Sequence, residues 1–279
     1  MKQTLYAALA LIFIISTARA QDFTIPQPST KQIITQEFGL GKITLSYCRP
    51  NVKGRKIFGY SEPYGIVWRT GANAATTISF TDEVTIEGQK VPAGEYALFT
   101  IPGEKEWTFI LNKTAKQWGA YAYKDIDDLI RFKVPRTHTP QLTETLTMQF
   151  TDATTLRCTL KMNWENTEAA LHFETDIDAR VMENIDKAMQ QAKKPYYFAA
   201  IYYYNNNKDI NKALEWINLH DQQQPGAYNV KYWKARIQLK AGDKKGAIAT
   251  ATDGLKLATD ENNAEYIRLN KEVIAAAGS

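Results

Sequence analysis

The stretch LRCTLKMNW, residues 156–164, alternates apolar and polar side chains at every step. Its apolar members are Leu156, Cys158, Leu160, Met162 and Trp164. Successive side chains of an extended strand point to opposite faces, so a period of two places all five on one face. The pattern is typical of a half-buried strand, with one face against a core.

Further β-type runs lie on both sides of this strand and are separated by Gly and Pro. They span residues 43–48, 76–80, 84–87, 96–101, 107–112, 129–134, 142–150 and 169–174. About ten short strands with little helix between them indicate two packed antiparallel sheets. We therefore predict an all-β antiparallel sandwich, jelly-roll-like, over residues 21–176.

After residue 176 the apolar period becomes that of helices. The expected helices span residues 179–193, 196–206, 210–220, 227–240, 244–257 and 261–276. Asp209 and Asp243 precede two of them as N-caps and lie 34 residues apart. Small residues recur at the same spacing, a mark of the tetratricopeptide repeat, although Gln238 and Gly254 depart from its pattern. Residues 177–279 are therefore predicted to form an α-helical, tetratricopeptide-like domain.

The first twenty residues have the three parts of a secretory signal peptide. Lys2 precedes an apolar run over residues 5–15, and an Ala-x-Ala end closes at Ala20. The apolar run is shorter than the roughly 20 residues that a membrane-spanning helix needs. We expect cleavage after Ala20 and a periplasmic or secreted protein that does not span the membrane.

Composition excludes several classes of protein. The 279 residues carry 34 Lys and Arg against 30 Asp and Glu, a formal charge of only +4, which argues against a nucleic-acid partner. Two Cys exclude a multi-Cys metal site and a disulfide-dense scaffold, and three His leave little room for a His-based metal centre. The sequence thus predicts no metal and no cofactor.

The two cysteines fall on opposite strand faces. Cys158 shares the apolar face of its strand, whereas Cys48 alternates against Leu45 and Tyr47 and belongs to the polar face. A disulfide requires the two Cβ atoms to approach within about 4 Å. We therefore expect two free thiols, with Cys158 buried.

A basic segment provides the first candidate binding residues. Between Glu37 and Glu62 there are five bases and no acid, and Arg49, Lys53 and Arg55 are the three that we select as ligand-binding. Arginine forks and free backbone amides match the oxygens of carboxylate, sulfate or phosphate. The alternative is a solvated loop whose arginines pair with acids elsewhere.

The next segment adds Trp68, Arg69 and Asn73 on a Gly-bearing loop. An aromatic platform, a guanidinium and an amide together suit a carbohydrate or an anion. The alternative is structural, with Trp68 in the core, Arg69 bonded to loop carbonyls and Asn73 closing a turn.

Catalytic patterns are weak. His138, His172 and His220 show neither metal-ligand spacing nor a nucleophile motif, so we assign no catalytic residue. The acidic group at residues 125, 127 and 128 lacks the spacing of a calcium loop. The sequence favours a non-catalytic role, with a hydrolase or transferase as the alternative, in which Arg49 and Arg69 would stabilise an anionic intermediate together with Asn73.

Four ordered blocks carry a resemblance to a known family. They are SYCRPNVKGRKIFG (46–59), PYGIVWRTGANAATTISF (63–80), VPAGEYALFTIPGEKEWTFILNK (91–113) and WGAYAYKDIDDLIRFKV (118–134). Over residues 27–176 the chain resembles the bacterial exported domain-of-unknown-function family 2911. The resemblance implies an exported β-rich domain, sometimes followed by helical repeats, with no established activity. Similar proteins often carry an acidic residue at the position of Ala74, and its absence further disfavours catalysis.

The combined interpretation is an exported envelope protein of uncharacterised activity. We expect its β-sandwich to bind a small anionic or glycan-like ligand through the basic and Trp68 segments. The helical region would dock a protein partner, because paired helices of this repeat type expose an extended binding surface.

Overall fold

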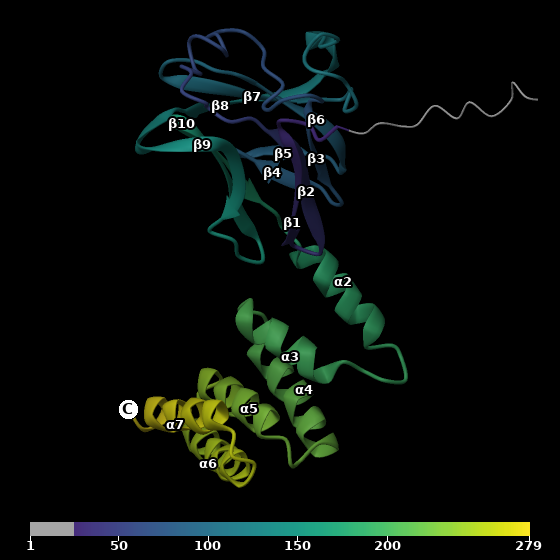
Figure 1. The fold of residues 1–279 in the computed structure, drawn as a ribbon. Helices are drawn as coiled ribbons and strands as arrows, with labels where there is room; N and C mark the ends of the chain where they lie inside the picture. The colour runs from purple at the N-terminus through teal and green to yellow at the C-terminus, as the bar shows by residue number, and fades with distance from the viewer. Residues whose placement is uncertain (1–24) are drawn as a thin grey trace, which may run out of the picture. The chain divides into compact units, whose positions relative to one another are not determined.

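The computed structural model describes residues 25–279, so the predicted signal peptide at residues 1–20 lies outside the described residues. The chain forms two compact units, which divide between Ile177 and Asp178. Strands make up the first unit and helices the second (Figure 1). Each unit is described by itself.

The first unit contains two antiparallel sheets, which confirms the predicted sandwich. The larger sheet has the order β1-β2-β3-β6-β7-β8 and the smaller β5-β4-β10-β9. The strands are β1 (Thr30–Phe38), β2 (Gly41–Arg49), β3 (Thr76–Phe80), β4 (Val84–Ile86), β5 (Gln89–Val91), β6 (Gly94–Ile101), β7 (Glu106–Asn112), β8 (Asp128–Pro135), β9 (Thr137–Thr151) and β10 (Arg157–Glu174).

Strand β10 joins two runs that the sequence suggests are separate, 156–164 and 169–174. Glu165, between them, has a φ of +53°, and the register against β9 shifts on both sides of it. Such an irregularity bends a strand and increases its twist without ending it. Strand β1, which pairs with β2 along its whole length, escaped the sequence reading because its side chains are mostly exposed or half-buried.

The core lies between the two sheets and is dominated by aromatic rings. Trp107 is fully buried, with the ring centroid of Phe58 4.7 Å away. Cys158, Leu160, Met162 and Trp164 all belong to this cluster, as the alternation predicts, whereas Leu156 precedes the first residue of β10 and is 38% exposed. Along each strand of the larger sheet, alternate side chains point into this core and the remaining ones point away from it. We call the face that points away from the core the outer face.

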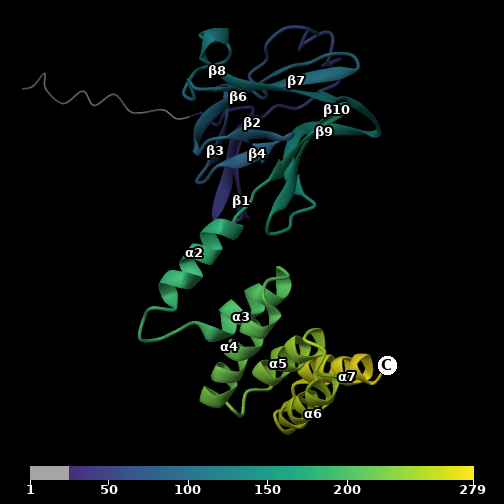
Figure 2. The same ribbon diagram turned by 180° about the vertical axis from the view of Figure 1, so that it is seen from behind.

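The second unit consists of α2 (Asp178–Ala188), α3 (Tyr196–Asn205), α4 (Ile210–Gln223), α5 (Tyr228–Lys240), α6 (Lys244–Asp260) and α7 (Ala264–Gly278), shown from behind in Figure 2. Asp209 and Asp243 cap α4 and α6 by accepting hydrogen bonds from backbone N–H groups, which confirms their predicted role. Among the described residues, every helix is too short or too polar to cross a bilayer.

Candidate ligand-binding cleft

Trp68 lies in the sandwich core. Its side chain is only 3% exposed, and its ring stacks on Trp164 with centroids 5.6 Å apart and planes at 15°. The indole Nε1 donates to Gly71 O at 3.1 Å. The structural alternative raised for this residue matches these contacts, and no ring face is open for a ligand to stack on.

The basic loop is bonded to its own neighbourhood. Arg49 donates from Nε to Leu146 O at 2.9 Å and from Nη2 to Thr147 Oγ1 at 2.9 Å. Arg55 closes the loop on itself, with Nη2 2.6 Å from Asn51 O. The backbone N–H of Lys53 donates to Glu144 Oε1 at 2.8 Å, whereas its side chain is exposed.

Arg69 and Arg55 both act on a half-buried carboxyl group, that of Glu62. Burial raises the pKa of Glu62 to about 7, and the positive charges of Arg69 and Arg55 oppose that rise. The backbone of Glu62 is fixed as well, since its N–H donates to Ile57 O at 2.9 Å. Glu62 is therefore a group that changes charge near neutral pH inside the loop region.

A cleft of about 410 Å³ lies on the outer face of the larger sheet. Its lining residues are Lys31, Ser46, Tyr47, Cys48, Ala74, Ala75, Thr77, Glu95, Ala115, Lys116, Gln117 and Trp118. The strand register explains the floor, because Ser46 pairs with Thr77 and Lys31 with Cys48 on adjacent strands. We call this hollow the outer cleft.

None of the six residues predicted to bind a ligand lines the outer cleft. Arg49 instead borders a separate hollow with Gln32 and Gln149. Two of the six are sequence neighbours of the cleft, since Arg49 follows Cys48 and Asn73 precedes Ala74. Of the six predicted residues, Arg49 and Asn73 are therefore adjacent in sequence to residues that line the cleft, but they do not line it themselves.

One wall of the outer cleft is the β7–β8 loop, residues 113–127, which ends in the short 3-10 helix η2 (Asp125–Asp127). The loop is bonded to residues 73–75 by backbone atoms. Ala75 N donates to Gln117 O and Gly119 N to Asn73 O, both at 3.0 Å. Asn73 thus holds the loop with its carbonyl, and its side-chain amide donates to Ser29 O at 3.3 Å.

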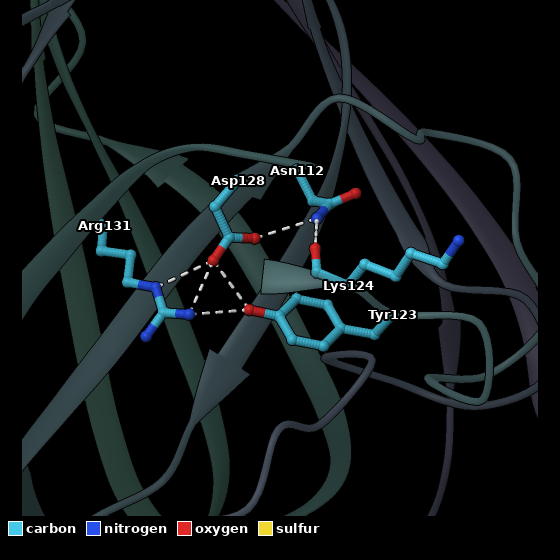
Figure 3. Close-up of polar contacts among 5 residues, drawn as sticks. All are labelled: Asn112, Tyr123, Lys124, Asp128 and Arg131. Carbon is cyan, nitrogen blue, oxygen red and sulfur yellow. Dashed lines mark hydrogen bonds and ion pairs between the residues drawn. The ribbon is translucent and has the colours of Figure 1, made fainter. Parts of the chain in front are cut away.

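Asn112 closes the base of the β7–β8 loop (Figure 3). Its Nδ2 donates to Lys124 O at 3.0 Å and to Asp128 Oδ1 at 2.9 Å, so one side chain ties both ends of the loop together. Its Oδ1 accepts from Thr114 N at 3.0 Å. Asn112 is fully buried, and a buried amide with all of these partners fixes the local backbone.

Asp128 completes the same network. Its Oδ2 accepts from Tyr123 OH at 2.7 Å and from Arg131 Nε at 2.9 Å, and Arg131 also donates to the Tyr123 oxygen (Figure 3). Burial, together with the hydrogen bond to Asp128, raises the pKa of Tyr123 to about 12, so the phenol stays protonated and donating. Asp128, one of the three clustered acidic residues at 125, 127 and 128, thus helps to hold the β7–β8 loop in place.

Beneath the loop, apolar side chains of the outer face form a second small core. Ala75, Ala97, Phe99 and Ile110 are buried there, and Ala120 and Tyr123 of the loop pack against them together with Val67 and Ile101. This packing and the Asn112 network hold the loop in place from two sides. The loop wall of the outer cleft is consequently held by contacts within the domain.

Three side chains that the sequence reading missed give the cleft its chemistry. Lys31 and Lys116 are exposed cations, and Trp118 is 64% exposed beside them. Hydroxyl groups come from Ser46 and Thr77 on the floor. The polar side of strand β2 was the signal available in the sequence, since Ser46 and Cys48 alternate with the core residues.

Charge in the outer cleft is weakly positive. Glu95 is the acid among the lining residues, against two lysines. Ala74 also lines the cleft. Within residues 25–279, no group of three or more His, Cys, Asp or Glu side chains is placed to hold a metal ion.

Both cysteines are free and buried, which confirms that prediction. Cys158 belongs to the core between the sheets, and burial raises the pKa of its thiol to about 11. Cys48 borders the outer cleft, on the opposite side of the larger sheet from the core. The two thiols therefore lie on different sides of the larger sheet, as the alternation of their strands predicts.

The fold and the cleft define a two-sheet β-sandwich with a small polar hollow on its outer face, followed by a helical unit. The chain belongs to the family described as "Protein of unknown function (DUF2911)", whose model matches residues 29–173. No curated protein and no solved structure matches the chain significantly.

Proposed function

We propose that this is an exported envelope protein whose β-sandwich binds a small anionic, glycan-like ligand in the outer cleft. The observation that carries the proposal is the exposed Trp118 ring beside two lysines in a hollow of about 410 Å³. Known small-molecule sites are hollows of about 300–1,000 Å³ that combine apolar surface with a few polar groups.

The lining residues fit an acidic sugar in particular. A sugar ring has an apolar face, which packs on an exposed indole, and hydroxyl groups, which pair with Ser46, Thr77 and Gln117. A carboxylate on that sugar would be attracted by Lys31 and Lys116, since charge-assisted hydrogen bonds are stronger than neutral ones.

Galacturonate and uncharged galactose are suitable probes for calorimetric titration of the protein at low salt. We expect galacturonate to bind about tenfold more tightly than galactose, because one favourable charge contact is worth about 1.4 kcal/mol. Trp118→Ala and Lys116→Gln should each weaken galacturonate binding by about tenfold.

Lys113→Gln is the matched control, since Lys113 is an exposed lysine of the same loop that does not line the cleft. It should bind galacturonate as the unaltered protein does. Absence of galacturonate binding, or equal effects of the Lys113 and Lys116 substitutions, would contradict the proposed site.

For the helical unit we propose docking of an acidic segment of a partner protein. Support comes from a groove of about 380 Å³ on α3, α5 and α7, lined by Tyr204, Tyr232, Arg236, Leu239, Lys240, Leu269, Glu272, Val273 and Ala276. The Arg236 guanidinium lies 4.9 Å from the Tyr204 ring centroid and 4.8 Å from that of Trp233, which fixes the cation in the groove.

A fluorescent peptide of alternating Asp and Leu, compared with one of alternating Lys and Leu, tests this groove by anisotropy. The acidic peptide should bind more tightly, and Arg236→Gln should weaken its binding by about tenfold. Lys256→Gln, an exposed lysine of α6 outside the groove, serves as the control. Equal binding of the two peptides would overturn the proposal.

A further inference from the structure

The β7–β8 loop exposes more aromatic surface than the outer cleft uses. Besides Trp118, which lines the cleft, Tyr121 is 87% exposed and does not line it. Gly119, between the two rings, has a φ of +64° and so takes the left-handed conformation that glycine favours. The turn at Gly119 therefore sets two rings on one loop, one at the cleft and one beyond it.

Tyr121 is held by contact with this turn. A Cβ atom added at Gly119 would lie only 2.8 Å from Tyr121 Cε2, so the tyrosine ring packs against the bare glycine Cα. The backbone N–H of Gly119 is itself bonded to Asn73 O at 3.0 Å. The ring of Tyr121 is thus largely exposed, with one edge against Gly119.

The β7–β8 loop carries three lysines against two aspartates, Asp125 and Asp127. Lys113 and Lys124 are exposed in addition to the cleft lysine Lys116. Asp127 accepts a hydrogen bond from Thr114 Oγ1 at 3.1 Å, whereas Asp125 is exposed. A chain of acidic sugars would meet an aromatic ring and lysines in the cleft, and a second aromatic ring outside it.

We propose that the natural ligand class is a polymer of uronic acids rather than a free acidic sugar, with one unit in the outer cleft and a neighbouring unit on Tyr121. The inference rests on the proposed function of that cleft. Stacking on successive aromatic rings tolerates different linkages, because every sugar ring has an apolar face.

The test titrates galacturonate and its di-, tri- and tetramers into the protein. Affinity should rise by about tenfold from the monomer to the trimer, as one added ring contact would give. Tyr121→Ala should remove that gain, so that the trimer binds as the monomer does. Tyr60→Ala is the matched control, since Tyr60 is 77% exposed on a different loop, and it should keep the full gain.

Each other outcome has a separate meaning. Binding that does not change with chain length would overturn the polymer inference and leave the proposed cleft intact. No binding of monomer or oligomers would overturn both. A membrane surface is the alternative partner, because Ile126 on the same loop is 82% exposed. Binding to phosphatidylglycerol vesicles that depends on Tyr121 and Ile126, with no gain in affinity for the oligomers, would therefore also overturn the inference.

Discussion

Trp68→Ala should lower the free energy of unfolding of the β-sandwich by about 4 kcal/mol, as truncation of a buried tryptophan does. The ring is 3% exposed and contacts Trp164 face to face, with Phe58 6.0 Å and Trp107 6.3 Å away edge to face. Its removal leaves a cavity among three aromatic rings and frees Gly71 O from a buried hydrogen bond.

Urea titration with hydrogen–deuterium exchange, read at peptides of β6 and β7, reports the sandwich separately from the helices. Trp118→Ala is the matched control, because Trp118 is 64% exposed and its loss should change stability by less than about 0.5 kcal/mol. The pair separates two roles of tryptophan in one domain. Equal stability of the two variants would contradict the placement of Trp68 in the core.

Glu62→Gln should stabilise the sandwich by about 2 kcal/mol at pH 8 and have little effect at pH 4. At pH 4 the Glu62 carboxyl of the unaltered protein is protonated in both the folded and the unfolded state. The pKa of Glu62 is about 7 in the folded protein against an ordinary value of 4.5. Between these two values the unfolded chain has released a proton that the folded chain still holds. Stability therefore falls as pH rises from 4.5 to 7 and then levels off.

The full shift of the Glu62 pKa, from 4.5 to about 7, corresponds to about 3.5 kcal/mol at about 1.4 kcal/mol for each unit of pKa. Partial solvent access of the carboxyl group reduces the expected effect to about 2 kcal/mol. Unfolding free energies measured by urea titration from pH 4 to pH 9 give the profile for each variant. Glu104→Gln, an exposed glutamate, is the control and should leave the profile unchanged. A Glu62→Gln profile that parallels the native one would refute the assigned pKa.

The sequence predicted the fold well where one local signal decided it. Alternation in residues 156–164 placed Cys158 and Trp164 in the core correctly, because a half-buried strand shows its burial in its own period. Asp209 and Asp243 marked two helix starts because capping is a contact between near neighbours.

The outer cleft could not be predicted in this way. Its wall forms where Ala74 meets Trp118 in an isolated bridge, a contact between segments 44 residues apart that leaves no local pattern. The burial of Trp68 could not be predicted from local sequence either. In a loop without regular alternation nothing in the neighbouring residues indicates whether an indole faces solvent or core, and only the stacking on Trp164 decides it.

The closure of the β7–β8 loop by Asn112 also bears on conformational entropy. Ordering one flexible residue costs about 1–2 kcal/mol, so a loop that a small ligand had to order would consume more free energy than a few contacts return. Asn112 and Asp128 fix this loop in the folded chain without any ligand. The entropic cost therefore falls on folding, and even a ligand with few contacts meets a recognition surface that is already formed.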